Sequence, residues 1–398
     1  MSHATSAVLL TLVALGASGQ TREAEIEKER DRKQQQASAE VATKGENFFQ
    51  KIKDGQVMER ILGGMRGLRV GLGGLMTGSG FALGPEYDMA NPAQTVVLKT
   101  AARGSVRAYY LLDAELLFPR MLGDKAFFSA RARRRYAPQV DYFGPGANSE
   151  RSGRSRYLLE DTAFDATLGF EPSRNWRLGV IGGYLQSNTG PGRDRRRISS
   201  HSQFPEAPGM REQSDFLRAG GFVQYDYRDH PRGARRGGNY SLEYRYFADR
   251  GKTAFSFHRY DADVQQFIPF FNERRVVALR AQSILSVANG GNRVPFYLQP
   301  ALGGSEVGRG FRQFRFNDDN LMAFTAEYRW EVFAGLDMAI FSDAGKVFRR
   351  SKDLNLRDLE SSVGAGFRFN VRNNVVLRID AGFSHEGFQI WLKFRDVF

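Results

Sequence analysis

The amino-acid sequence predicts an all-β protein, a transmembrane β-barrel of 16 antiparallel strands with a short N-terminal helical segment. Apolar and polar residues alternate from about residue 66 onward, over segments that are mostly ten residues or longer. A tilted strand needs this length to cross the hydrocarbon layer, whereas strands of soluble sheets are usually shorter. The chain has 43 Gly, 32 Phe and 15 Tyr, which suit tight turns and aromatic girdles. It also ends on an alternating strand that stops at Phe398.

Charge and hydropathy exclude two classes of protein. The longest apolar run, residues 7–17, is too short to span a bilayer as a helix, which excludes a helical membrane protein. The net charge is +13, but the basic clusters at 131–135, 193–197 and 232–236 accompany no RNA-binding or helix-turn-helix signature. We therefore expect no nucleic-acid partner. These arginines are expected to face the lumen, or to contact lipopolysaccharide phosphates from loops.

The residues before the alternating region divide into two segments. Residues 1–19 hold an apolar stretch followed by small residues, which predicts a secretory signal peptide. Residues 20–64 begin with a highly charged, helix-favouring stretch, and we expect a charged periplasmic helical tether. The barrel domain is expected over residues 65–398. The absence of cysteine is compatible with an oxidising compartment, and the expected location is the bacterial outer membrane.

Sixteen segments carry the strand pattern. They span residues 66–75, 79–88, 95–104, 107–118, 126–136, 156–171, 176–188, 215–228, 239–249, 254–269, 275–288, 321–333, 336–348, 362–371, 375–384 and 387–398. An even number lets both ends of the barrel lie on one side of the membrane, and closure is needed because lipid cannot satisfy an open sheet edge. The apolar face of the last segment is interpreted as a C-terminal strand signal, made of Phe388, Ile390, Leu392, Phe394 and Phe398.

Two connections between segments are long. Residues 189–214 are rich in Arg, Ser, Pro and Gly and are expected to form an exposed loop. Residues 289–320 have the most unusual sequence, in which Arg309 stands between two glycines and Gly310 is followed by Phe311. This spacing predicts a tight hairpin tip that presents one long cation.

Two acidic residues on neighbouring segments are candidate partners for this cation. Glu327 lies on the polar face of the twelfth segment, and Asp343 shares a face with Phe341 on the thirteenth. If the loop folds back into the lumen, Arg309 can form a bidentate ion pair with Asp343 and approach Glu327. The alternative is an ordinary glycine-rich turn and two unrelated acidic residues.

At these residues the sequence resembles the BamA/TamA outer-membrane barrel family, also called the bacterial surface antigen family. The tip at 309–311 is similar to the family's Val-Arg-Gly-Phe/Tyr motif, although Gly308 precedes the arginine here. The segment from Phe341 to Gly345 is similar to its Phe-x-Asp-x-Gly motif. Further similar segments, in the family's order, are 142–149, 225–238 and 326–329.

The resemblance covers about residues 65–398 and implies a lumen-inserted loop beside a weak seam between the first and last strands. Arg309 would pin this loop to Asp343 and Glu327. The first strand carries Gly71, Gly73 and Gly74, which weaken packing and pairing and make it a candidate opening edge. Family members that assemble or translocate proteins carry periplasmic POTRA modules. No such pattern fits before residue 65, so a barrel-only member is expected.

The function implied by the resemblance is outer-membrane assembly or remodelling, or the export of a protein or lipid. The expected partners are outer-membrane lipids, lipopolysaccharide and a periplasmic protein, and the barrel is expected to be a monomer. A different class of function remains open: a passive pore, or a surface-binding barrel that contacts lipopolysaccharide.

No enzymatic activity, cofactor or metal site is expected. The sequence has no Gly-x-Ser-x-Gly elbow, and its five histidines form no metal-binding pattern. The remaining enzymatic alternative is a phospholipase with a wall-mounted Ser–His pair, in which His258 or His385 would act as the base.

Overall fold

The computed structural model describes residues 67–394, with gaps at 74, 77, 195, 252–253, 289 and 372–373. The expected signal peptide, the expected tether and Phe398 lie outside the described residues. No helix in the described part of the chain is long and apolar enough to cross a membrane.

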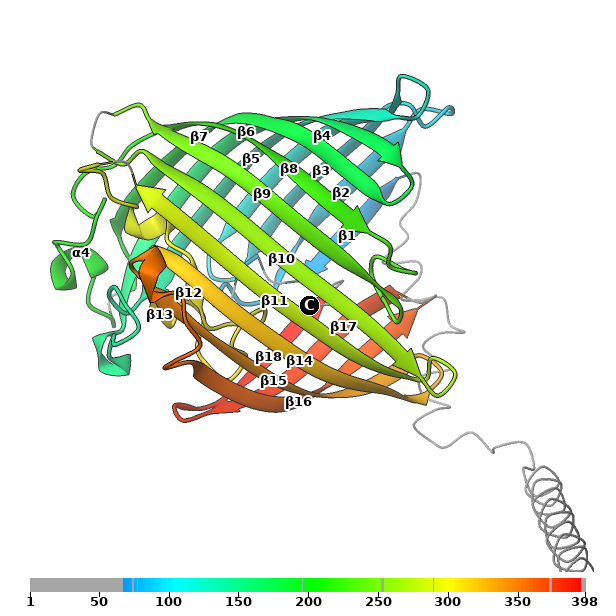
Figure 1. Cartoon of the computed structure of the whole chain (residues 1–398). Helices are drawn as coiled ribbons and strands as arrows, with labels where there is room; N and C mark the ends of the chain where they lie inside the picture. The colour runs from blue at the N-terminus through cyan, green and yellow to red at the C-terminus, as the bar shows by residue number, and fades with distance from the viewer. Residues whose placement is uncertain are drawn as a thin grey trace, which may run out of the picture. The chain divides into compact units, whose positions relative to one another are not determined.

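Sixteen strands form one sheet in which every hydrogen-bonded neighbour is antiparallel and follows in chain order, so the predicted fold class is confirmed (Figure 1). The sheet runs from β1 to β11 and continues from β14 to β18, while β12 and β13 pair separately. The bounds are β1 Leu68–Gly73, β2 Ala82–Ala90, β3 Val97–Ser105, β4 Tyr110–Met121, β5 Ala126–Tyr142, β6 Ser155–Ser173, β7 Trp176–Pro191, β8 Phe216–Asp226, β9 Gly237–Asp249, β10 Phe257–Phe270, β11 Arg275–Ala288, β12 Ala301–Leu302, β13 Phe316–Asn317, β14 Asn320–Phe333, β15 Leu336–Phe348, β16 Glu360–Val371, β17 Asn374–Ser384 and β18 Gly387–Phe394.

Because neighbouring strands are antiparallel, successive connections lie alternately at the two ends of the barrel. One end, here called the turn end, holds the start of β1, the end of β18 and mostly short turns such as 174–175 and 334–335. The opposite end, here called the loop end, holds the long connections. These carry the 3₁₀ turns η1 Arg151–Gly153, η2 Phe296–Leu298 and η3 Ser351–Asp353 and the helix α4 Ser200–Gln203. Bacterial outer-membrane barrels place short turns in the periplasm and long loops outside the cell.

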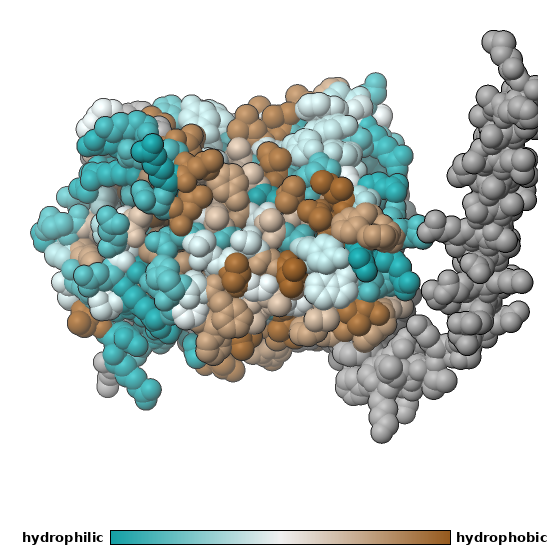
Figure 2. All heavy atoms as spheres, turned by 60° about the horizontal axis from the view of Figure 1, so that its bottom comes forward, coloured by the Kyte–Doolittle hydropathy of each residue, from teal (hydrophilic) through white to brown (hydrophobic). Residues whose placement is uncertain are grey.

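The outer wall exposes apolar side chains at alternate positions along the strands. On β18, Phe388, Ile390 and Leu392 are 62%, 66% and 55% exposed, whereas Trp391 between them is buried. Phe394 continues the outward face and is half-buried. Hydrophobic residues gather around the middle of the wall, between two hydrophilic ends (Figure 2). Such an apolar surface fits contact with acyl chains.

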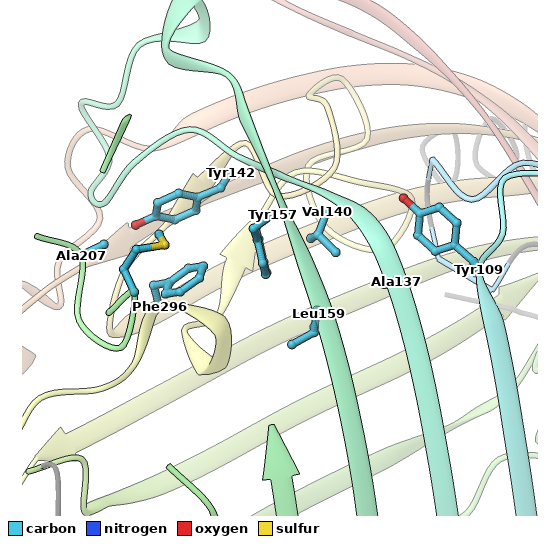
Figure 3. Close-up of a cluster of buried hydrophobic side chains, with 9 residues drawn as sticks. Tyr109, Ala137, Val140, Tyr142, Tyr157, Leu159, Ala207 and Phe296 are labelled. Atoms are coloured by element: carbon cyan, nitrogen blue, oxygen red, sulfur yellow. The ribbon is translucent and has the colours of Figure 1, made fainter. Parts of the chain in front are cut away.

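Long connections fold back into the mouth of the barrel at the loop end. Phe296 of η2 packs against Tyr142 and Tyr157 of the inner wall, with ring centroids 5.2 and 4.9 Å apart (Figure 3). Ala207 and Met210, from the connection after α4, complete the same buried cluster. The loops at this mouth are therefore held by a small apolar core of their own.

The observed strands differ from the predicted segments mainly at β5. This strand continues to Tyr142, six residues past its predicted end, after a register shift between Ala137 and Val140. Pro138 within the shift has no N–H to donate, and a bulge accommodates it without ending the strand. The two-residue strands β12 and β13 were not predicted, because they pair only once the loop has folded.

A buried carboxyl at the loop end gives the first testable prediction. Asp318 lies beside a cavity of about 690 Å³, and burial raises the pKa of Asp318 to about 6. An aspartate whose pKa is higher in the folded than in the unfolded state destabilises the fold when it ionises. We therefore expect Asp318→Asn to stabilise the barrel by about 1 kcal/mol at pH 8.

This advantage should decrease as the pH falls through 6 and vanish near pH 4, where the unfolded carboxyl also takes up its proton. Asparagine can still accept the hydrogen bond that the Asp319 N–H donates to the Asp318 carboxylate at 2.9 Å. Urea unfolding of both proteins at pH 8 and pH 4 measures the difference. Equal stability at pH 8 would contradict the prediction.

Candidate functional site: a buried arginine network in the lumen

The residues between β12 and β13, 303–315, form a loop that lies against the inner wall and is here called the lumen loop. Its tip is a turn in which the Phe311 N–H donates to the Gly308 carbonyl oxygen at 3.0 Å. Gly308 has a φ of +73°, a conformation that a residue with a Cβ rarely adopts. The turn places Arg309 at its first corner, so the loop presents this side chain to the wall.

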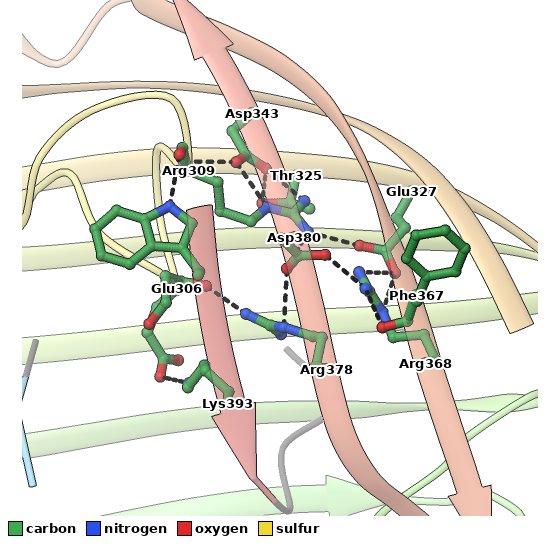
Figure 4. A network of polar contacts seen from close by, with 12 residues as sticks. Glu306, Arg309, Thr325, Glu327, Asp343, Phe367, Arg368, Arg378, Asp380 and Lys393 are labelled. Atoms are coloured by element: carbon green, nitrogen blue, oxygen red, sulfur yellow. Dashed lines mark hydrogen bonds and ion pairs between the residues drawn. The ribbon is translucent and has the colours of Figure 1, made fainter. Parts of the chain in front are cut away.

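Arg309 binds Asp343 of β15 through three hydrogen bonds (Figure 4). Its Nε and Nη2 donate to the two carboxylate oxygens at 2.9 and 2.8 Å, and its backbone N–H donates at 2.9 Å. Thr325 of β14 donates a further bond to Asp343 at 3.0 Å. The guanidinium carbon also lies 3.3 Å from the ring centroid of Phe341. The arginine is therefore fixed by a fork, a backbone bond and an aromatic face.

Glu327 of β14 connects this pair to a larger network. One of its oxygens accepts from Arg309 Nη1 at 2.8 Å. The other accepts from Arg329 Nε at 2.6 Å and from Arg368 Nη2 at 2.9 Å. Asp380 of β17 then accepts from Arg368 Nη1 at 2.5 Å. Four strands of the wall thus contribute to one set of charges.

Asp380 also binds Arg378, whose Nε lies 3.0 Å from its carboxylate. Arg378 in turn donates to the carbonyl oxygen of Ser305 in the lumen loop. The network contains four guanidinium groups, of Arg309, Arg329, Arg368 and Arg378, and three carboxylates, of Glu327, Asp343 and Asp380. All seven side chains are at most 6% exposed. Buried charges of this kind are stable only while each keeps its partners.

The backbone of the loop tip is bound to the last two strands. Trp391 Nε1 donates to the carbonyl oxygen of Arg309 at 2.6 Å, and Ser384 Oγ donates to that of Gly310 at 2.9 Å. A Cβ added at Gly310 would lie 2.6 Å from the Ser362 Cβ and 2.7 Å from the backbone of Phe383. Only glycine lets the tip approach the wall this closely.

Phe311 anchors the tip from the opposite side. Its ring is fully buried in an apolar cluster and lies edge-on to Phe316 of β13, 5.4 Å between centroids. Other members of the cluster are Leu302, Leu321 and Val347. The tip is therefore held by charge on one side and by apolar packing on the other.

Further contacts tie the lumen loop to the loop end and to β18. Arg315 donates to the Ser149 hydroxyl at 2.9 Å and to Glu386 at 2.6 Å. Ser149 belongs to the segment that resembles a family turn. Glu306 pairs with Lys393 of β18. These contacts join the loop to the β17–β18 turn and to the last strand.

A cavity of about 650 Å³ lies where the first and last parts of the sheet meet. It is lined by Met76 and Phe81 from the β1–β2 connection, by Glu306 from the lumen loop and by Ile390 and Phe394 from β18. Within the 16-stranded sheet of the described residues, β1 and β18 are the two strands that have one hydrogen-bonded neighbour each. The wall therefore has a seam at this position.

Of the residues singled out in the sequence, the structure brings together Arg309, Glu327, Phe341 and Asp343, with Gly310 and Phe311 at the same tip. Gly345 lies beside β14, where an added Cβ would be 2.7 Å from the Met322 carbonyl oxygen. Sequence reasoning did not identify Arg368, Arg378, Asp380 and Trp391. The sequence does place these residues at alternate positions, on the inward faces of their strands. Ordinary polar residues that line a water-filled lumen have the same spacing, so the pattern did not mark them.

The fold and the lumen loop can be compared with those of known proteins. The Omp85 superfamily domain matches residues 100–384. The fold is similar to that of the crystal structure of BamA from Haemophilus ducreyi lacking POTRA domains 1–3. That similarity has a TM-score of 0.60 at 14% identity and covers 83% of this chain and 70% of that one.

The fold is also similar to that of CdiB from Escherichia coli, with a TM-score of 0.54 at 13% identity. This match covers 83% of the chain and 62% of CdiB, which is less than two thirds of that protein. No curated protein matches the sequence. Both structural similarities concern the fold, whereas the domain match extends over most of the chain. The protein is an outer-membrane β-barrel that belongs to the Omp85 superfamily.

Proposed function

We propose that this barrel assembles, remodels or exports a protein or lipid at the bacterial outer membrane by opening at the seam between β1 and β18. The observation that carries the proposal is the distribution of the loop-tip contacts. The partners of Arg309 lie on β14, β15, β17 and β18, in the residues Glu327, Asp343, Asp380 and Trp391. The lumen loop thus binds the C-terminal strands into one block.

Opening at the seam would separate this block from β1 without breaking the arginine network. β1 is only six residues long and contains Gly71 and Gly73, so few side chains stabilise its edge. Parting any two strands within the block would instead expose buried charges that have lost their partners. Separating β1 from β18 therefore costs less free energy than separating any two strands of the block. Outer-membrane lipids, including lipopolysaccharide, and a periplasmic protein are the proposed partners of the monomeric barrel.

Cross-linking across the seam tests this function. The chain has no cysteine, so Met76→Cys with Ile390→Cys would provide the only two thiols, both lining the seam cavity. A bifunctional thiol reagent with a cleavable linker would join them. In the bacterium that carries this chain, we expect cross-linking to reduce outer-membrane assembly or export at least tenfold, and cleavage of the linker to restore it.

The matched control joins β17 to β18 through Ala381→Cys and Ile390→Cys, which are direct neighbours in the ladder. This cross-link leaves the seam free and should preserve function. Full function of the seam-linked protein, or equal loss in both proteins, would overturn seam opening.

A passive pore is the second candidate, because some inward-facing charges remain accessible to water. The side chain of Arg131, paired with Asp113, is 49% exposed. Against a wide pore, loops pack into the mouth around Phe296. Planar-bilayer recordings distinguish the two functions: a large, steady, ion-selective conductance supports the pore, whereas small flickering currents support a gated seam.

A further inference from the structure

The membrane-facing wall has an apolar groove across β4 to β8. This cavity of about 670 Å³ is lined by small residues, Ala114, Ala130, Ala132, Ala166 and Gly182, and by Phe164 and Leu217. In the ladder Ala114 pairs with Ala132, and Ala166 pairs with Ala130 and with Gly182. Phe164 and Leu217 are 53% and 45% exposed, so they point outward toward lipid. The groove is thus a depression in the lipid-facing surface with the shape that an acyl chain can fill.

A second cavity, of about 430 Å³, lies above this groove at the loop end. It is lined by Arg107 of the β3–β4 turn, Arg156 of β6, Arg196 and Arg197 of the β7–β8 connection, and by Gln139 and Asp194. The lining holds four guanidinium groups and one carboxylate, so its net charge is positive, although Arg156 Nε also pairs with Asp141 at 3.0 Å. The backbone N–H of Arg196 and the neighbouring arginines keep the pKa of Asp194 below its usual range. Asp194 therefore stays ionised and pairs with Arg156.

The groove and the arginine cavity lie on the same outer face. Arg156 and Phe164 are eight residues apart on β6, an even spacing within a strand whose burial alternates throughout this stretch. They are separated by roughly 26 Å along the strand. The face between them carries Arg134, whose Nη1 donates to Thr162 at 2.8 Å, and the stacked rings of Tyr110 and Tyr136. Aromatic residues at this height are typical of a membrane–water interface.

An apolar groove, an aromatic pair and an arginine cavity follow one another along this face. From this order and from the proposed outer-membrane location, we infer that the outer face of β4 to β8 binds lipopolysaccharide, a phosphate-bearing glycolipid of the outer leaflet. Its acyl chains occupy the alanine-lined groove, its sugars lie against Arg134 and the half-buried Tyr110, and its phosphates enter the arginine cavity. Guanidinium forks bind phosphate oxygens in pairs, which gives the cavity its selectivity for this group. The site lies on β3 to β8, and one hydrogen bond links it to the residues around the seam cavity: Arg107 Nη1 donates to the carbonyl oxygen of Gly78 at 2.8 Å.

The phosphate contacts are tested by Arg107→Gln, Arg196→Gln and Arg197→Gln combined. These three side chains are exposed, which makes the substitutions compatible with folding. The matched control removes three exposed arginines from the turn end, with Arg120→Gln, Arg174→Gln and Arg232→Gln. Binding of purified lipopolysaccharide to the detergent-solubilised full chain, measured by native mass spectrometry, is expected to weaken at least tenfold in the first variant and to stay unchanged in the control.

The groove is tested by Gly182→Leu, because a Cβ added there would meet no protein atom within 4 Å. Gly290→Leu, at an equally open glycine of a loop-end connection, is its control. We expect Gly182→Leu to weaken binding of intact lipopolysaccharide several-fold. It should leave binding of its deacylated form and of inorganic phosphate unchanged.

Equal weakening by the two arginine variants would overturn the site, because it would indicate general charge attraction. Unchanged lipopolysaccharide binding by Gly182→Leu would also overturn it, since the acyl chains would then lie elsewhere. Inorganic phosphate binding as tightly as lipopolysaccharide would assign the cavity to a free anion and exclude the glycolipid. All of these measurements use the purified barrel and do not depend on assembly or export, so their failure is distinct from failure of the seam.

Discussion

Replacing Arg309 with alanine is expected to lower the stability of the folded barrel by about 3–5 kcal/mol, because the substitution removes one partner of a buried ion pair. Asp343 would lose both side-chain bonds to the guanidinium group while remaining 1% exposed. Glu327 would keep Arg329 and Arg368. Most of the loss should therefore arise at Asp343, which would hold an uncompensated charge inside the lumen.

The measurement is the folded fraction on unboiled gels, where folded barrels migrate faster, together with urea unfolding in lipid vesicles. Arg350→Ala, at an exposed arginine of the next loop-end connection, is the matched control and should behave as the parent chain. Arg309→Lys should fall between the two, because lysine keeps the charge and loses the fork. An Arg309→Ala protein as stable as Arg350→Ala would refute a structural role of the network.

Replacing both partners separates stability from function. In Arg309→Met with Asp343→Leu, no charge of this pair remains buried, and such replacements often restore stability. We expect the double variant to recover much of the folded fraction. Because the loop tip would then be held by Phe311 and by backbone bonds alone, the seam-dependent activity should stay impaired.

The strand pattern could be predicted from the sequence because alternation is a local property of each segment. The bounds of β11 and β15 agree with the predicted segments, and the other barrel strands differ mostly by a few residues at their ends. The segment predicted for β5 was too short, because the continuation of this strand depends on Pro138 fitting into a bulge against β6. The fold of the loop-end mouth depends on contacts between distant segments, such as Phe296 with Tyr142, which no local pattern contains.

The candidate site could be predicted only where the residues themselves are unusual. Arg309 between glycines and Asp343 in its Phe-x-Asp-x-Gly setting stood out, and the structure brings them together. Arg368 and Asp380 look like ordinary water-lining residues, because the sequence does not indicate that the lumen loop covers them and removes the water. In the sequence, Trp391 lies among the polar positions of the last strand, and no residue near it suggests a hydrogen-bond partner. In the structure that partner is the carbonyl oxygen of Arg309.

Gly382→Ala is expected to displace the loop tip without removing any charge. A Cβ at this position of β17 would lie 2.4 Å from the Arg309 carbonyl oxygen and 2.8 Å from the Gly310 nitrogen. Both are backbone atoms that cannot rotate aside, so the tip must move away from the wall. We expect a loss of about 3 kcal/mol, at the upper end of the range for overpacking, because the movement also strains the Arg309–Asp343 pair.

Trp391 reports this displacement directly, since its indole N–H bonds to the same carbonyl oxygen. The chain has three tryptophans, so Trp176→Phe and Trp330→Phe leave Trp391 as the only one, and excitation at the red edge of the absorption band selects it over the tyrosines. In that background Gly382→Ala should shift the emission maximum to longer wavelength and reduce the folded fraction. Gly182→Ala, in an open position of the same sheet, should change neither. If Gly382→Ala behaves like this control, the tip does not rest on β17, and the C-terminal strands do not form one block.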